Sequence, residues 1–434
     1  MKIIMHGAAK EVGKSCIEIS TEKKRYLLDA GVKFIQHGVE YPKELDKIYD
    51  LDGLFLSHAH LDHSGALPML EHKNMNCPIY TTHLTWEITN MLLEDSYHLE
   101  KLKHIHPAYD HRDIQKVKSD LRFITYDKEY TTHDSKIKFQ NLNAGHIPGS
   151  ASILMNIEGM NVLYTGDINT EDTNLMVPSE LPQLTTPIDI MITENTYGDR
   201  RHPNREDSEQ GLIDSIHTCI RDGGSALVPV FSVGRSQEIL MILDKLDKNI
   251  PIYLDGMPRK LTEKVLRSDD KYIDNKAVLE RVFKRAILVE NPRERLHIAK
   301  KKGIVIVSSS GMIQGGPVVS YCDIFIHNRE NYVLLTGYQA NGTNGRSMFE
   351  DHMFYKDHKR YPVKCHVRKF DFSAHYGQTR IHKLIEKINP KHLILQHGDS
   401  GAIDAVAAWI KNNPEIKSKV YTPGIGEVMN FEKE

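Results

Sequence analysis

The sequence of 434 residues has little of what marks secreted, membrane-spanning or fibrous proteins. Its five cysteines are scattered, odd in number and without a CxxC pair, which argues against a disulfide framework and a cysteine-based zinc site. No stretch approaches the roughly 18 apolar residues that span a bilayer, and the N-terminus lacks a basic segment followed by an apolar one. We therefore expect a cytoplasmic protein with no membrane contact.

Charge of one sign is also lacking, because 56 Lys plus Arg face 58 Asp plus Glu, a formal net charge of −2. A chain of this balance does not hold nucleic acid by bulk charge, so an anionic substrate must meet a local basic patch. At 40% hydrophobic and 26% charged residues, the composition is that of ordinary globular proteins. Histidine stands out: the 24 residues are often grouped with Asp, and histidine is the commonest metal ligand.

Two sequence patterns alternate along the chain. Short apolar strands separated by Gly and Asp turns fill the first 200 residues and return near the C-terminus, whereas the intervening part alternates buried strands with helices. The second pattern predicts an α/β domain with a parallel sheet. We predict a first domain split into residues 1–202 and 366–434, with the α/β domain inserted at residues 203–365.

The strongest motif is HAHLDH, in which His58, His60, Asp62 and His63 occupy the turn between a predicted strand and a predicted helix. One Zn²⁺ takes about four ligands in a tetrahedral arrangement, so this run suits two ions side by side. We assign the first two histidines to one ion, and the Asp and the last histidine to the other.

The remaining ligands are expected where other strands end in glycine turns. His146 in NAGHIPGS completes the first site, His397 in LILQHGDSG completes the second, and the carboxylate of Asp167 in YTGDIN bridges both. Any one of these histidines alone is more simply a turn residue. Together with HAHLDH they predict two Zn²⁺ per chain.

These motifs resemble those of the metallo-β-lactamase superfamily, and Asp29 in YLLDAG matches its first acidic position. Glu194 in MITENTYGDR, His375 in FDFSAHYGQ and His397 match three further motifs of the β-CASP nucleases. GAAKEVGKSC, PVFSVGRSQEIL and SSSGMIQGGP are similar to archaeal and bacterial ribonucleases of the cleavage and polyadenylation specificity factor type, here without KH domains. The resemblance implies an αββα metallo-β-lactamase fold with an inserted α/β β-CASP domain.

Two positions narrow the activity that the resemblance implies. Iron-dependent redox relatives typically have Glu at the position of His60, so the histidine here favours a hydrolase. DNA-directed β-CASP members tend to have a small apolar residue at the position of His397, so the histidine here favours RNA as the substrate. The expected function is zinc-dependent hydrolysis of single-stranded RNA in processing, 3′-end maturation or decay, within a complex or alone. The C-terminal segment resembles one through which relatives form homodimers.

Phosphodiester hydrolysis needs an activated water, neutralised phosphate charge and a protonated leaving oxygen, and two zinc ions supply the first two. For the third we nominate His375, oriented by Glu194, and we count the ligand Asp62 among the catalytic residues. Asp29 is expected to orient His58 or His60 rather than to bind metal, with an ordinary turn carboxylate as the alternative.

The inserted domain carries a local positive excess, with 14 Lys plus Arg against 8 Asp plus Glu in residues 251–310. This suits an RNA-guiding surface, and also a solvated helix exterior. A glycine-rich run after the strand GIVIV offers hydroxyls and backbone N–H groups to a phosphate. The predicted RNA contacts are Ser308, Ser309, Ser310, Gly311, Ser373, Arg235 and Arg346, the last three suggested by the resemblance.

Two other functions are alternatives. A catalytically silent scaffold subunit of an RNA-processing complex is expected to lack metal ligands, and none is missing from this sequence. A DNA-directed β-CASP nuclease is the second. The sequence leaves open whether cleavage is internal or proceeds from a 5′ end, and which RNA is the substrate.

Overall fold

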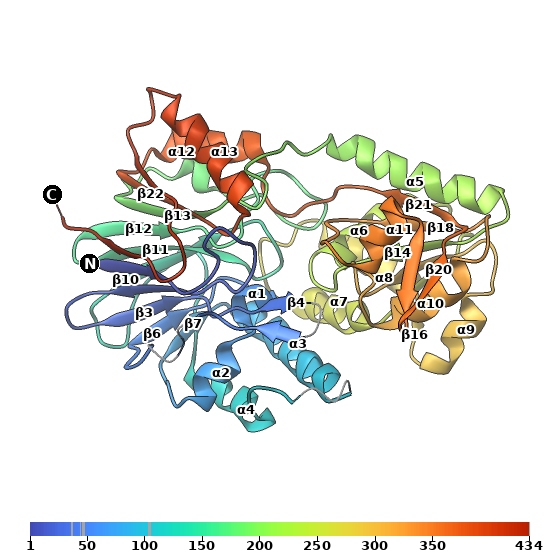
Figure 1. Cartoon of the computed structure of the whole chain (residues 1–434), viewed down its shortest axis with the longest axis horizontal. Coiled ribbons are helices and arrows are strands. Elements are labelled where there is room, and N and C mark those ends of the chain that lie inside the picture. The colour runs from blue at the N-terminus through green and yellow to red at the C-terminus, as the bar shows by residue number, and fades with distance from the viewer. Residues whose placement is uncertain (36–37, 44, 46–47, 103–105, 434) are drawn as a thin grey trace. The chain divides into compact units, whose positions relative to one another are not determined.

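The computed structural model of the chain describes residues 1–35, 38–43, 45, 48–102 and 106–433, which form two compact units (Figure 1). The first unit consists of Met1–Asp172, Pro178–Arg201 and His375–Glu434, and the second of Thr173–Val177 and His202–Ala374. The backbone therefore crosses between the units four times.

Two seven-stranded sheets form the centre of the first unit. The strands of the first sheet, in order across it, are β24 (Val428–Asn430), β1 (Lys2–Met5), β2 (Ile17–Ser20), β3 (Arg25–Leu28), β6 (Gly53–Phe55), β7 (Ile79–Thr81) and β8 (Leu121–Phe123). Those of the second are β23 (Lys419–Tyr421), β22 (His392–Gln396), β13 (Ile190–Glu194), β12 (Met160–Tyr164), β11 (Ala151–Ile157), β10 (Lys138–Asn143) and β9 (Glu129–Thr131). Each sheet is antiparallel in one half and parallel in the other, from β3 to β8 and from β12 to β23.

The two sheets face each other across one apolar core, to which Ile17 and Phe55 of the first sheet and Phe139 and Ile153 of the second contribute. Helices cover both outer faces (Figure 1). They are α1 (Leu61–Ser64), α2 (Leu67–His72), α3 (His83–Leu102) and α4 (His111–Asp120) on the first sheet, and α12 (Gln378–Ile388) and α13 (Ser400–Lys411) on the second. The predicted αββα arrangement is confirmed. A hairpin of β4 (Lys33–Ile35) and β5 (Gly38–Glu40) and the turn η2 (Leu181–Gln183) complete the unit.

The second unit is built on a six-stranded sheet in which every neighbouring pair is parallel. Its strands, in order, are β16 (Ile287–Val289), β15 (Ile252–Asp255), β17 (Val305–Ser308), β14 (Ala226–Pro229), β18 (Tyr332–Leu335) and β21 (His366–Lys369). The central strands are wholly buried and rich in Val, Ile and Leu, as helices on both faces of a parallel sheet require. The predicted inserted α/β fold is confirmed.

Helices of this unit alternate with its strands. They are α5 (Arg205–Arg221), α6 (Arg235–Leu243), α7 (Met257–Arg267), α8 (Lys276–Arg285), α9 (Arg295–Ile298), α10 (Pro317–Phe325) and α11 (Asn344–Glu350), with the turn η3 (Pro292–Glu294) and the hairpin β19 (Met353–Lys356) and β20 (Lys359–Pro362). In the described part of the chain, no helix is both long enough and apolar enough to cross a membrane.

The unit boundaries differ from the predicted domain limits at three places, of which the smallest is His202, predicted in the first domain and found in the second unit. Residues 366–374 lie in the second unit, where β21 is an edge strand whose mostly exposed residues lack the apolar pattern of the other strands. Residues 173–177 also belong there, because the backbone N–H groups of Asn174 and Leu175 donate to the carboxylate of Glu238. The segment also forms backbone hydrogen bonds within the second unit, from the N–H of Val177 to the carbonyl of Tyr272 at 3.0 Å and from the N–H of Asp274 to the carbonyl of Leu175 at 2.8 Å. Contacts between residues so far apart in the sequence leave no periodic signal.

Candidate metal centre

Polar residues gather where strands of the first unit end. At or just beyond the ends of six strands lie Asp29 (β3), His58 (β6), His146 (β10), Asp167 (β12), Glu194 (β13) and His397 (β22). β10 runs in the same direction as β12, since both are antiparallel to β11. The carboxyl ends of β10, β12, β13 and β22 therefore lie at one edge of the second sheet, and those of β3 and β6 at one edge of the first, the usual place of a site in sheets of this kind.

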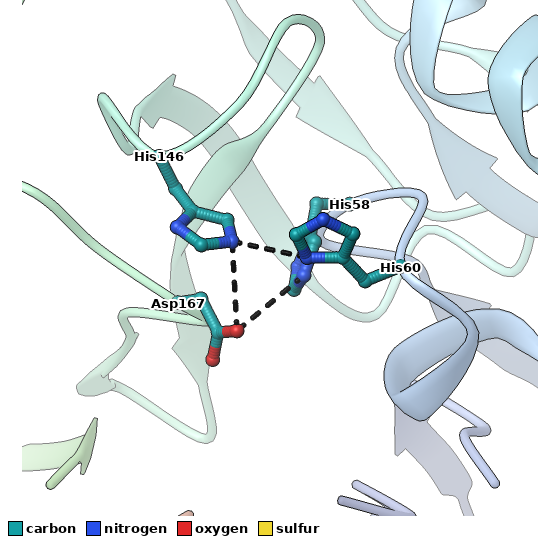
Figure 2. A group of neighbouring side chains, drawn as sticks. All are labelled: His58, His60, His146 and Asp167. Atoms are coloured by element: carbon teal, nitrogen blue, oxygen red, sulfur yellow. Dashed lines mark hydrogen bonds and ion pairs between the residues drawn. The ribbon is translucent and has the colours of Figure 1, made fainter. Parts of the chain in front are cut away.

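Figure 2 shows the first group of candidate ligands, His58, His60, His146 and Asp167, whose side chains point toward one another. Nε2 of His58 lies 3.5 Å and Nε2 of His146 3.7 Å from Asp167 Oδ2, and His146 Nε2 lies 3.1 Å from His60 Nδ1. Zinc bonds of about 2.0–2.2 Å place tetrahedral ligand atoms roughly 3.3 Å apart. The spacing of this group fits one zinc ion.

A second group meets the other oxygen of the same carboxylate. His63 Nε2 lies 3.2 Å and His397 Nδ1 3.4 Å from Asp167 Oδ1. Asp62 Oδ2 lies 3.5 Å from His397 Nε2, and the Asp62 carboxylate also groups with His63 and His58. The structure thus brings together all seven residues that the sequence predicted as ligands, with one carboxylate between two sets of them.

Several of these atoms make no hydrogen bond to a described residue, although they lie within ion-pair distance of one another. Within the described residues, His58 Nε2, His63 Nε2 and Asp167 Oδ1 are buried and lack a hydrogen bond. Leaving a buried polar atom unpaired costs about 1–3 kcal/mol, so three that face one another fit a metal ion. Burial lowers the pKa of His58, and lowers that of His60 to about 4, so both rings are neutral at pH 7 and have a lone pair to give.

The carboxylate of Asp29 orients the ligands from behind. Oδ2 lies 2.7 Å from His63 Nδ1 and accepts a hydrogen bond of 2.7 Å from the Tyr164 hydroxyl. Ser57 donates its N–H to Oδ1 and its hydroxyl to Oδ2, and the same hydroxyl lies 3.0 Å from His58 Nδ1. Asp29 therefore holds one metal ligand directly and another through a serine.

Two residues that support the ligands were not predicted from the sequence. Ser57 directly precedes His58, a position from which a hydroxyl can reach the next ring, and this signal was available. Tyr164 ends β12 and begins the YTGDIN motif, but nothing in that motif indicates that its hydroxyl meets a carboxylate of the other sheet. Asp29 was expected to orient His58 or His60, whereas its direct bond is to a third ligand, His63.

The backbone near the ligands adopts conformations that side chains disfavour. Asp29 and His397 have φ of 60° and 48°, in the left-handed region that non-glycine residues rarely occupy. Gly31 lies so close to the HAHLDH turn that a Cβ there would be 1.7 Å from the carbonyl oxygen of Asp62. Such strain persists where the surrounding structure holds it, as at functional sites.

His375 and Glu194 stand beside the cluster. Nδ1 of His375 lies 3.0 Å from both carboxylate oxygens of Glu194 and 3.8 Å from Asp167 Oδ2. Glu194 is fully buried and also accepts the backbone N–H of Ile168 at 2.8 Å. Burial alone would lower the pKa of His375, but the charges of Glu194 and Asp167 outweigh it and raise the pKa to about 9. The ring is protonated at neutral pH, and its side chain is 20% exposed.

The predicted RNA contacts lie in the second unit. Ser308 ends β17, and Ser309, Ser310 and Gly311 follow it. The Ser310 hydroxyl donates to the carbonyl of Gly315 at 3.2 Å. A Cβ at Gly311 would lie 2.9 Å from the backbone nitrogen of Phe231, so this loop needs a glycine there.

The other predicted contacts are spread over the same unit. Arg235 begins α6, Arg346 pairs with Glu350 at 2.8 Å, and the N–H of Ser373 donates to Asp371 at 2.9 Å.

Part of the positive excess at residues 251–310 is structural. Arg295 pairs with the buried Asp255 at 2.7 Å, and Arg285 donates to main-chain carbonyls.

Models of three protein families match the chain. They are a metallo-β-lactamase superfamily domain at residues 18–196, a β-CASP domain at 236–348 and a Zn-dependent metallo-hydrolase RNA specificity domain at 360–423. "Probable RNase MJ4" of Methanocaldococcus jannaschii is 38% identical over 98% of this chain and 99% of its own length. The chain belongs to the β-CASP group of the metallo-β-lactamase superfamily.

Other relatives of this group are named for RNA processing. "RNase aCSPSF2" of Saccharolobus solfataricus is 34% identical over 98% of this chain and 84% of its own, and "Cleavage and polyadenylation specificity factor 73" of Drosophila melanogaster is 30% identical over 96% and 63%. A crystal structure of a protein of unknown function from Enterococcus faecalis V583 has the same fold, with a TM-score of 0.64 over 99% of both chains at 14% identity. The family membership predicted from the motifs is confirmed, and the His/Asp cluster could hold a metal ion, as the matched Zn-dependent metallo-hydrolase domain requires.

Proposed function

We propose that the chain is a dizinc ribonuclease that hydrolyses phosphodiester bonds of single-stranded RNA in processing, 3′-end maturation or decay. The position of Asp167 carries this proposal. Its two oxygens face different pairs of histidines, and the His375–Glu194 pair lies next to it. A carboxylate shared between two ligand sets suits two metal ions, the arrangement found in phosphodiesterases.

When bound, the two zinc ions supply the Lewis acidity that activates water and neutralises charge on the scissile phosphate. One ion would be held by His58, His60, His146 and Asp167, and the other by Asp62, His63, His397 and Asp167. The side chain of Asp62 is 31% exposed, so its carboxylate can also hold the attacking water by a hydrogen bond.

The chain itself contributes a proton. His375 is charged at neutral pH because its raised pKa of about 9 keeps the ring protonated. It donates that proton to the departing 3′ oxygen, while the buried carboxylate of Glu194 fixes the ring at Nδ1 and stabilises its charge. The products then carry a 5′ phosphate and a 3′ hydroxyl.

The second unit is proposed to bind the RNA. Its contacts are the predicted hydroxyls, glycine N–H groups and arginines: Ser308, Ser309, Ser310, Gly311, Ser373, Arg235 and Arg346. A homodimer is proposed from the resemblance of the C-terminal segment, as is membership of an RNA-processing or decay complex. A reducing, cytoplasmic environment fits the five cysteines, all buried and unpaired.

The test is digestion of one unstructured RNA, labelled at the 5′ or the 3′ end, by zinc-loaded wild type, His375→Ala and His397→Ala. His327→Ala is the matched control, because this histidine is exposed in the second unit. We expect cleavage by wild type and control, and its loss in the two site variants. Internal fragments indicate an endonuclease, whereas immediate release of the labelled 5′ nucleotide indicates a 5′ exonuclease. No cleavage by a zinc-loaded wild type would overturn the proposal.

A further inference from the structure

One hydroxyl lies between the metal ligands and the proton donor. Thr196 occupies the turn after β13, and its Oγ1 lies 2.5 Å from Glu194 Oε2 and 3.3 Å from His397 Nδ1. The same hydroxyl is 3.2 Å from the carbonyl oxygen of His397. β13 and β22 are parallel neighbours that pair as far as Glu194 and Gln396, so the turns that follow the two strands meet at this point.

The donors and acceptors around His397 fix the direction of these hydrogen bonds. The backbone N–H of Gly13 can only donate, and it lies 3.3 Å from His397 Nε2. In the metal-free protein the Nε2 lone pair accepts this N–H, so the proton resides on Nδ1. Nε2 also lies 3.5 Å from Asp62 Oδ2, and a zinc ion bound there would take the same lone pair in place of the Gly13 N–H while the proton stays on Nδ1. The single hydrogen of the Thr196 hydroxyl is directed to Glu194 Oε2 at 2.5 Å, which is much nearer than the other acceptor, the carbonyl oxygen of His397 at 3.2 Å. Thr196 Oγ1 therefore accepts from Nδ1–H of His397.

We propose that Thr196 is a positioning residue that couples the metal ligand His397 to Glu194, and through Glu194 to the proton donor His375. The hydroxyl sets the tautomer of one ring and satisfies one oxygen of the carboxylate that holds the other. Partners of this kind orient metal ligands, and their loss typically costs about 10–100-fold in metal affinity or activity. The catalytic part of this coupling rests on the proposed ribonuclease function, while the orientation of His397 does not.

Two substitutions separate the hydroxyl from the shape of the side chain. Thr196→Val keeps the shape and removes the hydroxyl, whereas Thr196→Ser keeps the hydroxyl. Thr132→Val is the matched control: Thr132 is buried in the same unit and donates to the carboxylate of Asp134 at 2.6 Å, so this variant also loses a short threonine–carboxylate bond.

The readouts are the rate of zinc release to a chelator and the single-turnover rate of RNA cleavage at zinc saturation. For Thr196→Val we expect faster zinc release and cleavage slowed by about 10–100-fold. Thr196→Ser should restore most of both losses, and Thr132→Val should match the wild type. Wild-type values for Thr196→Val would overturn the proposal. Slow cleavage with wild-type zinc release would also overturn it, because the hydroxyl would then act on Glu194 alone.

A measurement on the wild type needs neither a variant fold nor cleavage. In zinc-loaded protein labelled with ¹⁵N-histidine, the ring signals of His397, assigned by their loss in His397→Gln, should show a proton on Nδ1. A proton on Nε2 would contradict the proposed chain of hydrogen bonds. If the wild type cleaves no RNA, the ribonuclease proposal fails, whereas the zinc release and the tautomer still decide the role of Thr196.

Discussion

The two units of the chain use buried charge in different ways. In the second unit, buried carboxylates are enclosed by donors: Asp255 accepts from Arg295 and from the Tyr321 hydroxyl, at 2.7 Å and 2.8 Å. In the first unit, the buried ligand atoms of His63 and Asp167 face each other at 3.2 Å without a hydrogen-bond partner among the described residues.

This difference distinguishes buried polar groups that stabilise the fold from those that are placed to bind a further group. A buried carboxylate whose partners are all protein donors holds the fold together, and nothing more is required to explain it. A set of buried polar atoms that make no hydrogen bond is costly unless a further group binds there. The difference supports the proposed metal binding in the first unit, and RNA binding by the second unit remains part of the proposal.

The largest effect is expected for Asp167→Asn, because this carboxylate serves both metal sites. The metal ions are expected to stabilise the transition state by several kcal/mol, and about 1.4 kcal/mol corresponds to a tenfold change in rate. The rate of RNA cleavage should therefore fall by at least about a thousand-fold. Zinc content by mass spectrometry should fall in parallel. Asp255→Asn, the matched change in the second unit, should lower the unfolding midpoint and keep the zinc. Equal zinc loss in both variants would remove the distinction between the units.

His375→Ala is expected to have the next largest effect. General acid catalysis contributes typically 10²–10⁴-fold, so the single-turnover rate of RNA cleavage should fall by about that factor. Zinc content should remain that of the wild type, because His375 is not among the seven proposed ligands. A variant that loses zinc would instead show that His375 belongs to the metal cluster itself.

Smaller effects are expected from the arginines of the second unit. Arg235→Ala and Arg346→Ala should each raise KM for RNA more than they lower kcat, because a phosphate contact supports binding. For single strands, each lost phosphate contact should make the slope of log affinity against log salt shallower by about 0.7. Binding titrations at several salt concentrations measure this slope. An unchanged slope would show that these arginines do not contact RNA.

The smallest effect concerns stability, at a carboxyl of the first unit outside the metal cluster. Burial and the charge of Asp120 raise the pKa of Glu71 from 4.5 to about 7, with Asp113 and Lys116 also nearby. Because the folded state favours the protonated form, the stabilisation from Glu71 is complete below about pH 4.5 and is lost as the pH rises through about 7.

The measurement is the urea midpoint of the first unit at pH 5.5 and pH 8. The urea midpoint should fall less for Glu71→Gln than for the wild type when the pH rises from 5.5 to 8, because an amide does not ionise. Identical losses in both proteins would show that Glu71 ionises normally.

What the sequence could predict was set by local pattern. The proposed ligands could be predicted because four of them fall within six consecutive residues and the others follow apolar strands. The end of a strand places the side chains that follow it at the edge of the sheet. The parallel sheet of the second unit could also be predicted from local pattern, because strands covered by helices on both faces are continuously apolar. Thr196 was not predictable, because its meeting with His397 depends on the register of two strands about 200 residues apart. The segment 173–177 depends in the same way on distant partners, the carboxylate of Glu238 and the backbone of residues 272–274.

The most direct test is a zinc titration of chelated, metal-free protein, followed by both bound zinc and cleavage of single-stranded RNA. We expect cleavage to reach its plateau at two zinc ions per chain, and Asp167→Asn to retain neither zinc nor activity. Full cleavage with one zinc per chain, or none with both sites filled, would contradict a dizinc ribonuclease bridged by Asp167.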